Sequence, residues 1–204
     1  MVTTSTAAPA ASTNLTDGFH VLVQSLLKND LNRMYGVIGI PVTDVARIAQ
    51  AKGIRYIGMR HEADAGNAAA AEGFITGKPG LYLTVSAPGF LNGIVPLKEA
   101  TENGWPVIMM AGSSSRELID LGEGDYEGLD QLNYAKPFAK AAYRVDKVED
   151  IPLVVARAYP RPCRPRDAAS PWWARAPRGS PAPTSPPLWA MRCTCTRAAP
   201  SWAA

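Results

Sequence analysis

Three segments of this chain carry residue types that could do chemistry, and each follows a short apolar run. The first ends in Arg60, His61 and Glu62 and leads into residues 63–71, where alanines dominate and Asp64 is the one charged residue. A carboxylate in the first turn of a helix is common, because it complements the helix dipole. In alanine-rich surroundings, however, Glu62 could face an apolar interface, where a carboxyl group can share a proton with a ring nitrogen.

The second segment is Ser-Ala-Pro-Gly-Phe-Leu-Asn-Gly over 86–93, between a predicted strand and a predicted helix. Its Pro88 and Gly89 indicate a tight turn in which glycine lets the backbone approach a ligand, although a simple connector would have the same spacing. The third segment, around 124–131, surrounds Tyr126 with acidic residues, and on charge alone it is typical of a solvated surface. These acids are Glu123, Asp125, Glu127 and Asp130.

Alternating strand and helix patterns must position these segments. They predict an α/β fold, a mostly parallel sheet with helices on both faces. Ligands of such sheets bind beyond the carboxyl ends of the strands, so a site is expected within 39–41, 60–62, 86–92 and 112–133. Helices are expected over 17–29, 41–53, 62–76, 92–102 and 148–158, and strands over 33–38, 54–59, 81–86, 107–111 and 138–145, with 87–89 as a turn.

Several common sites are disfavoured by their missing motifs. Gly36 and Gly39 have the wrong spacing for a dinucleotide fingerprint, and no phosphate loop occurs. Residues 112–115 follow a strand but lack the spacing of a hydrolase elbow. A plain nicotinamide, nucleoside-triphosphate or hydrolase site is therefore not expected.

The bulk composition bears on location. No apolar run reaches the about 18 residues of a membrane-spanning helix, so no membrane partner is expected. Residues 1–14 lack the basic start and apolar region of a secretory signal and are expected to form a flexible leader. Residues 1–159 contain no cysteine, which favours a reducing, cytoplasmic setting.

Taken in order, the segments Y-G-V-I-G-I-P, R-H-E, L-T-V-S-A-P-G-F-L-N-G and G-D-Y-E-G-L-D-Q resemble thiamine-diphosphate-dependent decarboxylases. The long matches at 35–41, 83–93 and 124–131 point within that group to the oxalyl-CoA decarboxylase family. R-H-E and P-G are also shared with acetolactate synthases and 2-hydroxyacyl-CoA lyases. The resemblance implies a pyrimidine-binding domain over 15–159, the first of three domains and without its last strand.

The resemblance also assigns roles near the cofactor. It implies that Glu62 hydrogen-bonds N1′ of the aminopyrimidine and so promotes loss of the proton at C2 of the thiazolium. Pro88, Gly89 and Asn92 match the turn beside that ring. Ala63 stands where the family usually has Gln, and Asn67 where it commonly has Tyr. Both departures adjoin the carboxylate without removing it.

On the substrate side, Ile40 matches a position that contacts cofactor or substrate, and Tyr126 and Glu127 match a pair beside the oxalyl group. The implied reaction converts oxalyl-CoA to formyl-CoA and carbon dioxide, with thiamine diphosphate and with Mg²⁺ held in a C-terminal domain. The implied assembly is a homodimer or homotetramer, since the cofactor lies between two subunits. The alternative enzymes are 2-hydroxyacyl-CoA lyase and other thiamine-diphosphate enzymes.

Residues 160–204 differ from the rest of the chain. They hold 7 Arg and 1 Asp, a net charge of +6, and 10 of the 18 prolines, whereas residues 1–159 hold 14 Lys+Arg and 17 Asp+Glu, a net charge of −3. A non-catalytic protein with a nucleic-acid-binding tail that stacks on Trp172 and Trp173 is one interpretation. A metal site is another, but C-x-C with one distant cysteine is a poor zinc pattern. The abrupt change favours a third, out-of-frame translation of a GC-rich gene, which predicts a truncated fragment that is inactive alone.

Overall fold

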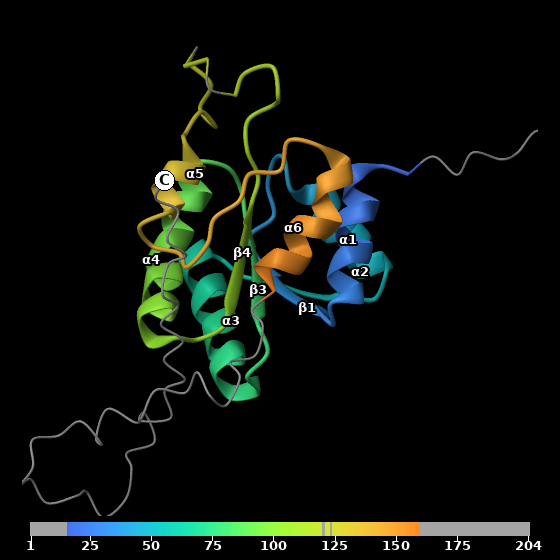
Figure 1. The fold of residues 1–204 in the computed structure, drawn as a ribbon, viewed down its shortest axis with the longest axis vertical. Coiled ribbons are helices and arrows are strands. Elements are labelled where there is room, and N and C mark those ends of the chain that lie inside the picture. Colours follow the sequence, from blue (N-terminus) through green and yellow to red (C-terminus); the bar gives the residue numbers. More distant parts are fainter. Residues whose placement is uncertain (1–15, 120, 123, 160–204) are drawn as a thin grey trace, which may run out of the picture.

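The computed structural model describes residues 16–119, 121, 122 and 124–159. The expected leader and the interpretations of residues 160–204 lie outside the described residues. The described chain alternates strands and helices as expected (Figure 1). In chain order these are α1 (Gly18–Lys28), β1 (Arg33–Gly36), α2 (Thr43–Ala51), β2 (Arg55–Gly58), α3 (Glu62–Thr76), β3 (Gly80–Thr84), α4 (Pro88–Asn103), β4 (Val107–Ala111), α5 (Gln131–Ala135), the short 3-10 helix η1 (Val148–Asp150) and α6 (Ile151–Ala158).

The four strands form one parallel sheet in the order β2-β1-β3-β4. All five residues of β3 are buried, as expected for an inner strand whose two faces are both covered by helices. The register pairs Tyr35 with Tyr82 and Leu83 with Met110. Because all strands are parallel, their carboxyl ends meet at one edge of the sheet, and the predicted α/β fold is confirmed.

Helices cover both faces of the sheet. Figure 1 shows α3 and α4 on one side and α1, α2 and α6 on the other. Val23, Leu26 and Met34 belong to the larger of the two cores, which lies under α1 and α2. No helix of the described chain is both long and apolar enough to cross a membrane.

The contact between α3 and α4 depends on small residues. A Cβ added at Gly66 would lie 2.3 Å from Cγ of Pro96, and Ala65 and Ala69 are fully buried. Glycine is required at residue 66 because any side chain there would overlap the proline ring. The alanine-rich helix therefore approaches its neighbour closely, as the sequence predicts.

Two predicted boundaries were wrong. Helix α2 begins at Thr43, so Pro41 lies in the preceding turn, after a cis peptide bond to Ile40. Helix α4 begins at Pro88 instead of near Asn92, because proline has no N–H to leave unsatisfied and suits a first helical turn. The chain reverses one step earlier, at Ala87, whose φ is +36°.

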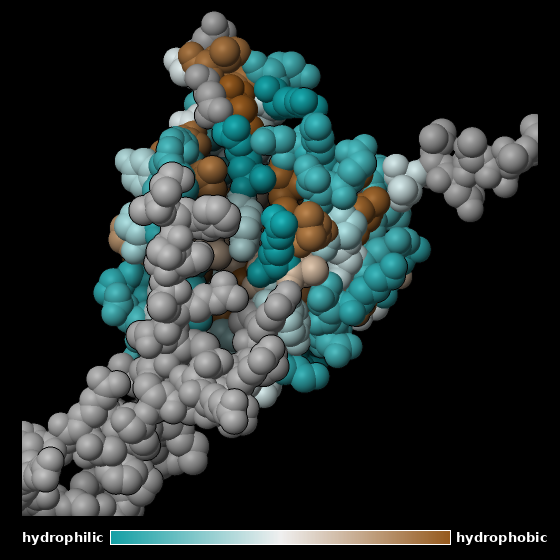
Figure 2. Space-filling view, viewed as in Figure 1, coloured by the Kyte–Doolittle hydropathy of each residue, from teal (hydrophilic) through white to brown (hydrophobic). Residues whose placement is uncertain are grey.

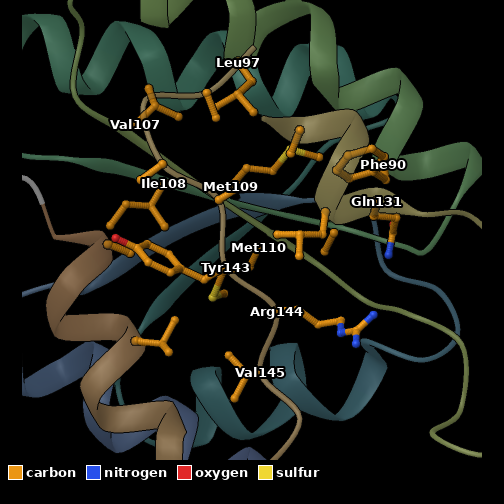
Figure 3. Close-up of a pocket in the computed structure, with 18 of the residues that line it drawn as sticks. Phe90, Leu97, Val107, Ile108, Met109, Met110, Gln131, Tyr143, Arg144 and Val145 are labelled. Carbon is orange, nitrogen blue, oxygen red and sulfur yellow. The ribbon is translucent and has the colours of Figure 1, made fainter. Parts of the chain in front are cut away.

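The predicted strand over 138–145 was also wrong, and the short helix α5 before it was not predicted. This segment and β4 both line a cavity of about 2350 Å³, and none of the described backbone hydrogen bonds joins residues 140–145 to β4. Figure 3 shows Tyr143, Arg144 and Val145 among the side chains that line this cavity, together with Met109 and Met110. Without a neighbouring strand to exchange backbone hydrogen bonds with, an apolar run alone does not produce a strand.

Candidate functional site

Glu62 is the first residue of α3 and lies at the carboxyl edge of the sheet, four residues beyond the end of β2. His61 caps the N-terminus of this helix, because its Nδ1 accepts a hydrogen bond from the backbone N–H of Ala63 at 3.1 Å. Glu62 is only 7% exposed. A carboxylate this deeply buried needs hydrogen-bond donors close by.

The carboxylate of Glu62 meets the first turns of α4. Nδ2 of Asn92 donates a hydrogen bond to its Oε2 at 3.1 Å. A Cβ added at Gly89 would lie 2.8 Å from Oε1 and 2.4 Å from Cγ2 of Val85. The structure therefore brings together three of the residues predicted to surround a cofactor, and Gly89 is required by the close approach. Pro88 stands beside them at the start of α4.

Further groups at this edge come from the ends of other strands. A Cβ added at Gly112 would lie 3.0 Å from Oγ of Ser86 and 2.7 Å from Cδ of Pro41. The hydroxyl groups of Thr84 and Ser86 are buried without a hydrogen-bond partner among the described residues. Ser86 and Gly112 lie within the ranges 86–92 and 112–133 where a site was expected, although neither was given a role. Thr84, the last residue of β3, lies outside those ranges.

Tyr126 and Glu127 form a separate pair on the loop between β4 and α5. The Tyr126 hydroxyl donates to Oε1 of Glu127 at 3.3 Å, and the tyrosine is 68% exposed. The recorded hydrogen bonds of this pair stay within the loop and do not reach Glu62. Ile40 is likewise 74% exposed. Of the predicted substrate-side residues, Tyr126 and Ile40 are exposed and Glu127 is half-buried. Of the predicted cofactor-side residues, Glu62 and Gly89 are buried, whereas Pro88 and Asn92 are exposed beside them.

Comparison with known proteins identifies the family of the chain. Residues 16–134 match the family described as thiamine pyrophosphate enzyme, N-terminal TPP binding domain. The chain belongs to the thiamine pyrophosphate enzymes. Thiamine pyrophosphate is the cofactor also called thiamine diphosphate, so the fold and the cofactor class expected from the sequence are confirmed.

Individual relatives of this thiamine pyrophosphate enzyme match over the same part of the chain. It is 61% identical over 144 residues to the oxalyl-CoA decarboxylase of Escherichia coli K12, which is 71% of this chain and 26% of that protein. It is 46% identical over 155 residues to a 2-hydroxyacyl-CoA lyase of Oryza sativa subsp. japonica, 76% of this chain and 26% of that protein. The human 2-hydroxyacyl-CoA lyase 1 is 37% identical over 141 residues, 69% of this chain and 24% of that protein. The chain spans about a quarter of the length of these relatives.

The corner around Glu62 fits the aminopyrimidine ring of the family's cofactor. Oε2 of the carboxylate is held by Asn92, while Oε1 faces the backbone of Gly89, where a side chain would fill the space. A carboxyl group in a poorly solvated place can share a proton with a ring nitrogen. The described residues contain no group of three or more His, Cys, Asp or Glu side chains that could hold a metal ion.

Proposed function

We propose that this chain is the pyrimidine-binding part of an oxalyl-CoA decarboxylase, a lyase of oxalate catabolism that releases formyl-CoA and carbon dioxide from oxalyl-CoA. The observation that carries the proposal is the buried Glu62 carboxylate, held by Asn92 and backed by the bare backbone of Gly89. The choice of substrate is supported by 61% identity to the decarboxylase, against 46% to the rice lyase.

In this proposal Glu62 holds a proton at N1′ of the aminopyrimidine. Asn92 keeps the carboxylate pointed at that ring, and Pro88 and Gly89 bring the first turn of α4 close to it. Thiamine diphosphate supplies the electron-accepting thiazolium ring that makes decarboxylation possible. The alanine-rich wall of α3 excludes water, which favours proton sharing between the carboxyl group and the ring.

Tyr126, Glu127 and Ile40 contact the substrate end in the same proposal. Tyr126 and Glu127 orient the oxalyl group and water, and Ile40 supports cofactor or substrate. Their exposure supports a site that a second surface completes. We propose that this surface belongs to another subunit, a homodimer or homotetramer, which also holds the diphosphate and its Mg²⁺. We place the enzyme in the cytoplasm, in line with the cysteine-free residues 1–159.

The domain is proposed to comprise residues 15–159 and to accept one more strand beside β4. Gly80 N donates to Pro106 O, and Gly112 N donates to Thr84 O, so the even-numbered residues of β4 face β3. The backbone of Val107, Met109 and Ala111 therefore faces the cavity, where no described residue bonds it. An open edge beside an apolar cavity is the place where the expected last strand would pair.

The proposal is tested by grafting residues 16–159 in place of the matching segment of the E. coli oxalyl-CoA decarboxylase, and separately into the rice 2-hydroxyacyl-CoA lyase. We expect the first hybrid to form formyl-CoA from oxalyl-CoA and the second to lose lyase activity. A lyase hybrid that works beside an inert, folded decarboxylase hybrid would assign the chain to the lyases. The purified 204-residue chain is expected to form no formyl-CoA, and measurable product from it would refute the composite site.

A further inference from the structure

The side chain of Gln131, the first residue of α5, joins two distant parts of the backbone. Its Nε2 donates to the carbonyl oxygen of Gly112 at 2.7 Å, and its Oε1 accepts from the N–H of Ala87 at 3.2 Å. Figure 3 shows this side chain at one end of the cavity, beside Phe90 of α4. Asp130 caps α5 by accepting a hydrogen bond from the N–H of Asn133 at 3.1 Å. Gln131 is therefore the first residue of a capped helix.

The bond to Gly112 closes the neck of a surface loop. Gly112 and Gln131 stand directly before and after residues 113–130, which carry Tyr126 and Glu127. Figure 2 shows hydrophobic side chains exposed at the tip of the molecule, where this loop projects. Leu118 and Leu121 are 40% and 58% exposed, so little packing holds the tip. The position of the loop therefore depends strongly on its neck.

The bond to Ala87 supports the turn that starts α4. Ala87 has φ +36° and ψ −88°, which an L-residue rarely adopts, and no side chain caps the helix there. Such a backbone conformation is strained and persists only where its surroundings hold it. Gln131 supplies the acceptor for this N–H. The next turn of the helix carries Gly89 and Asn92, which adjoin the Glu62 carboxylate.

We propose that Gln131 is a positioning residue that couples the loop over 113–130 to the turn in front of α4. Gln131 thereby holds this loop in a fixed place relative to the corner around Glu62. Calling the loop substrate-side and the corner cofactor-side rests on the function proposed above. The amide is suited to this position because the two bonds need one donor and one acceptor on the same group. An ionised carboxylate offers acceptors alone, and a methionine of similar length offers no donor and only a weak acceptor.

Two substitutions in the full 204-residue chain separate the two bonds. In Gln131→Glu at pH 7.5, an ionised carboxylate still accepts from Ala87 but repels the Gly112 carbonyl, so the neck opens while the turn stays closed. At pH 4 the protonated carboxyl group donates again and the neck closes. In Gln131→Met both bonds are lost at either pH.

The measurements are NMR protection factors of the Ala87 amide and backbone ¹⁵N relaxation across 113–130. We expect Gln131→Met to lower Ala87 protection about ten-fold, the effect of one lost hydrogen bond. We expect Gln131→Glu to keep that protection and to show a loop that is more mobile at pH 7.5 than at pH 4. The unsubstituted chain at both pH values controls for Asp130 and other titrating groups, and amide protection in β3 reports folding.

The coupling would be overturned if the loop over 113–130 of Gln131→Glu had the same mobility at both pH values. It would also be overturned if the Ala87 amide of Gln131→Met kept the protection factor of the unsubstituted chain. If Gln131→Met does not fold, Gln131→Glu still decides, since the same molecule is compared with itself. Neither readout needs catalysis. An inert decarboxylase hybrid would therefore refute the proposed function and leave this inference standing. Loop mobility that is the same at both pH values in Gln131→Glu would refute this inference and leave the proposed function standing.

Discussion

The buried corner around Glu62 and the exposed loop over 113–130 carry the two halves of the proposed chemistry, and they are held in different ways. The corner is held by close packing of α3 against α4, where Gly66, Gly89 and Tyr82 leave almost no free space. Among the described residues, the side chain of Gln131 holds the loop at its neck. The difference shows that a cofactor-side carboxylate can be fixed by core packing within this domain. The exposed loop depends instead on hydrogen bonds such as those of Gln131.

The largest effect is expected where packing is tightest. Gly66→Ala places a methyl group against the ring of Pro96, which cannot yield, and should lower the free energy of unfolding by about 3 kcal/mol. Urea unfolding of the full chain measures this change. Gly18→Ala is the matched control, since its added Cβ would make ordinary contacts at 3.4 Å and beyond. An equal loss of unfolding free energy in Gly18→Ala would show that the contact with Pro96 is not the cause.

Replacing a tyrosine with phenylalanine once in the packed region and once on the loop sharpens the comparison. The hydroxyl of Tyr82 is fully buried and donates to the carbonyl oxygen of Gly93 at 2.7 Å. Tyr82→Phe removes this buried hydrogen bond and should cost about 1–2 kcal/mol, whereas Tyr126→Phe on the exposed loop should cost less than about 0.5 kcal/mol. Equal losses of unfolding free energy in the two variants would contradict the division into a packed corner and a free loop.

A smaller effect is expected at alkaline pH. Burial raises the pKa of Tyr82 above its ordinary range and raises the pKa of Tyr56 to about 12. Because the folded state holds these protons more tightly than the unfolded chain, the stabilisation is complete below about pH 10 and is lost as pH rises further. Unfolding free energies measured from pH 8 to 11 should fall in the unsubstituted chain and fall less steeply in Tyr82→Phe. Parallel curves would show that the buried phenol does not titrate with unfolding.

More of the structure around Glu62 than of the loop over 113–130 could be predicted from the sequence. Helix α3 over 62–76 and strand β4 over 107–111 were predicted to the residue, because a capped alanine-rich helix and an apolar run between turn residues are local signals. Gln131 could not be found in this way. Its two partners lie 19 and 44 residues away and are backbone atoms, which leave no trace in the pattern of side chains.

The strand predicted over 138–145 failed for a related reason. The segment is mostly apolar, but a strand needs a neighbouring strand to bond to, and none of the described backbone hydrogen bonds joins residues 140–145 to β4. The start of α4 was misplaced because Pro88 and Gly89 are common in turns, and only the conformation of Ala87 shows that the chain has already reversed.

The central claim, that Glu62 is the proton-holding group of the cofactor-side corner, is tested most directly by the rate of hydrogen–deuterium exchange at C2 of thiamine diphosphate. The measurement uses the hybrid that carries residues 16–159 in the E. coli decarboxylase, with Glu62→Gln compared against Glu102→Gln, an exposed residue of α4. The account predicts a fall of about 10²–10⁴-fold for Glu62→Gln and no change for Glu102→Gln. An exchange rate in Glu62→Gln equal to that of the unsubstituted hybrid, with cofactor bound, would contradict it.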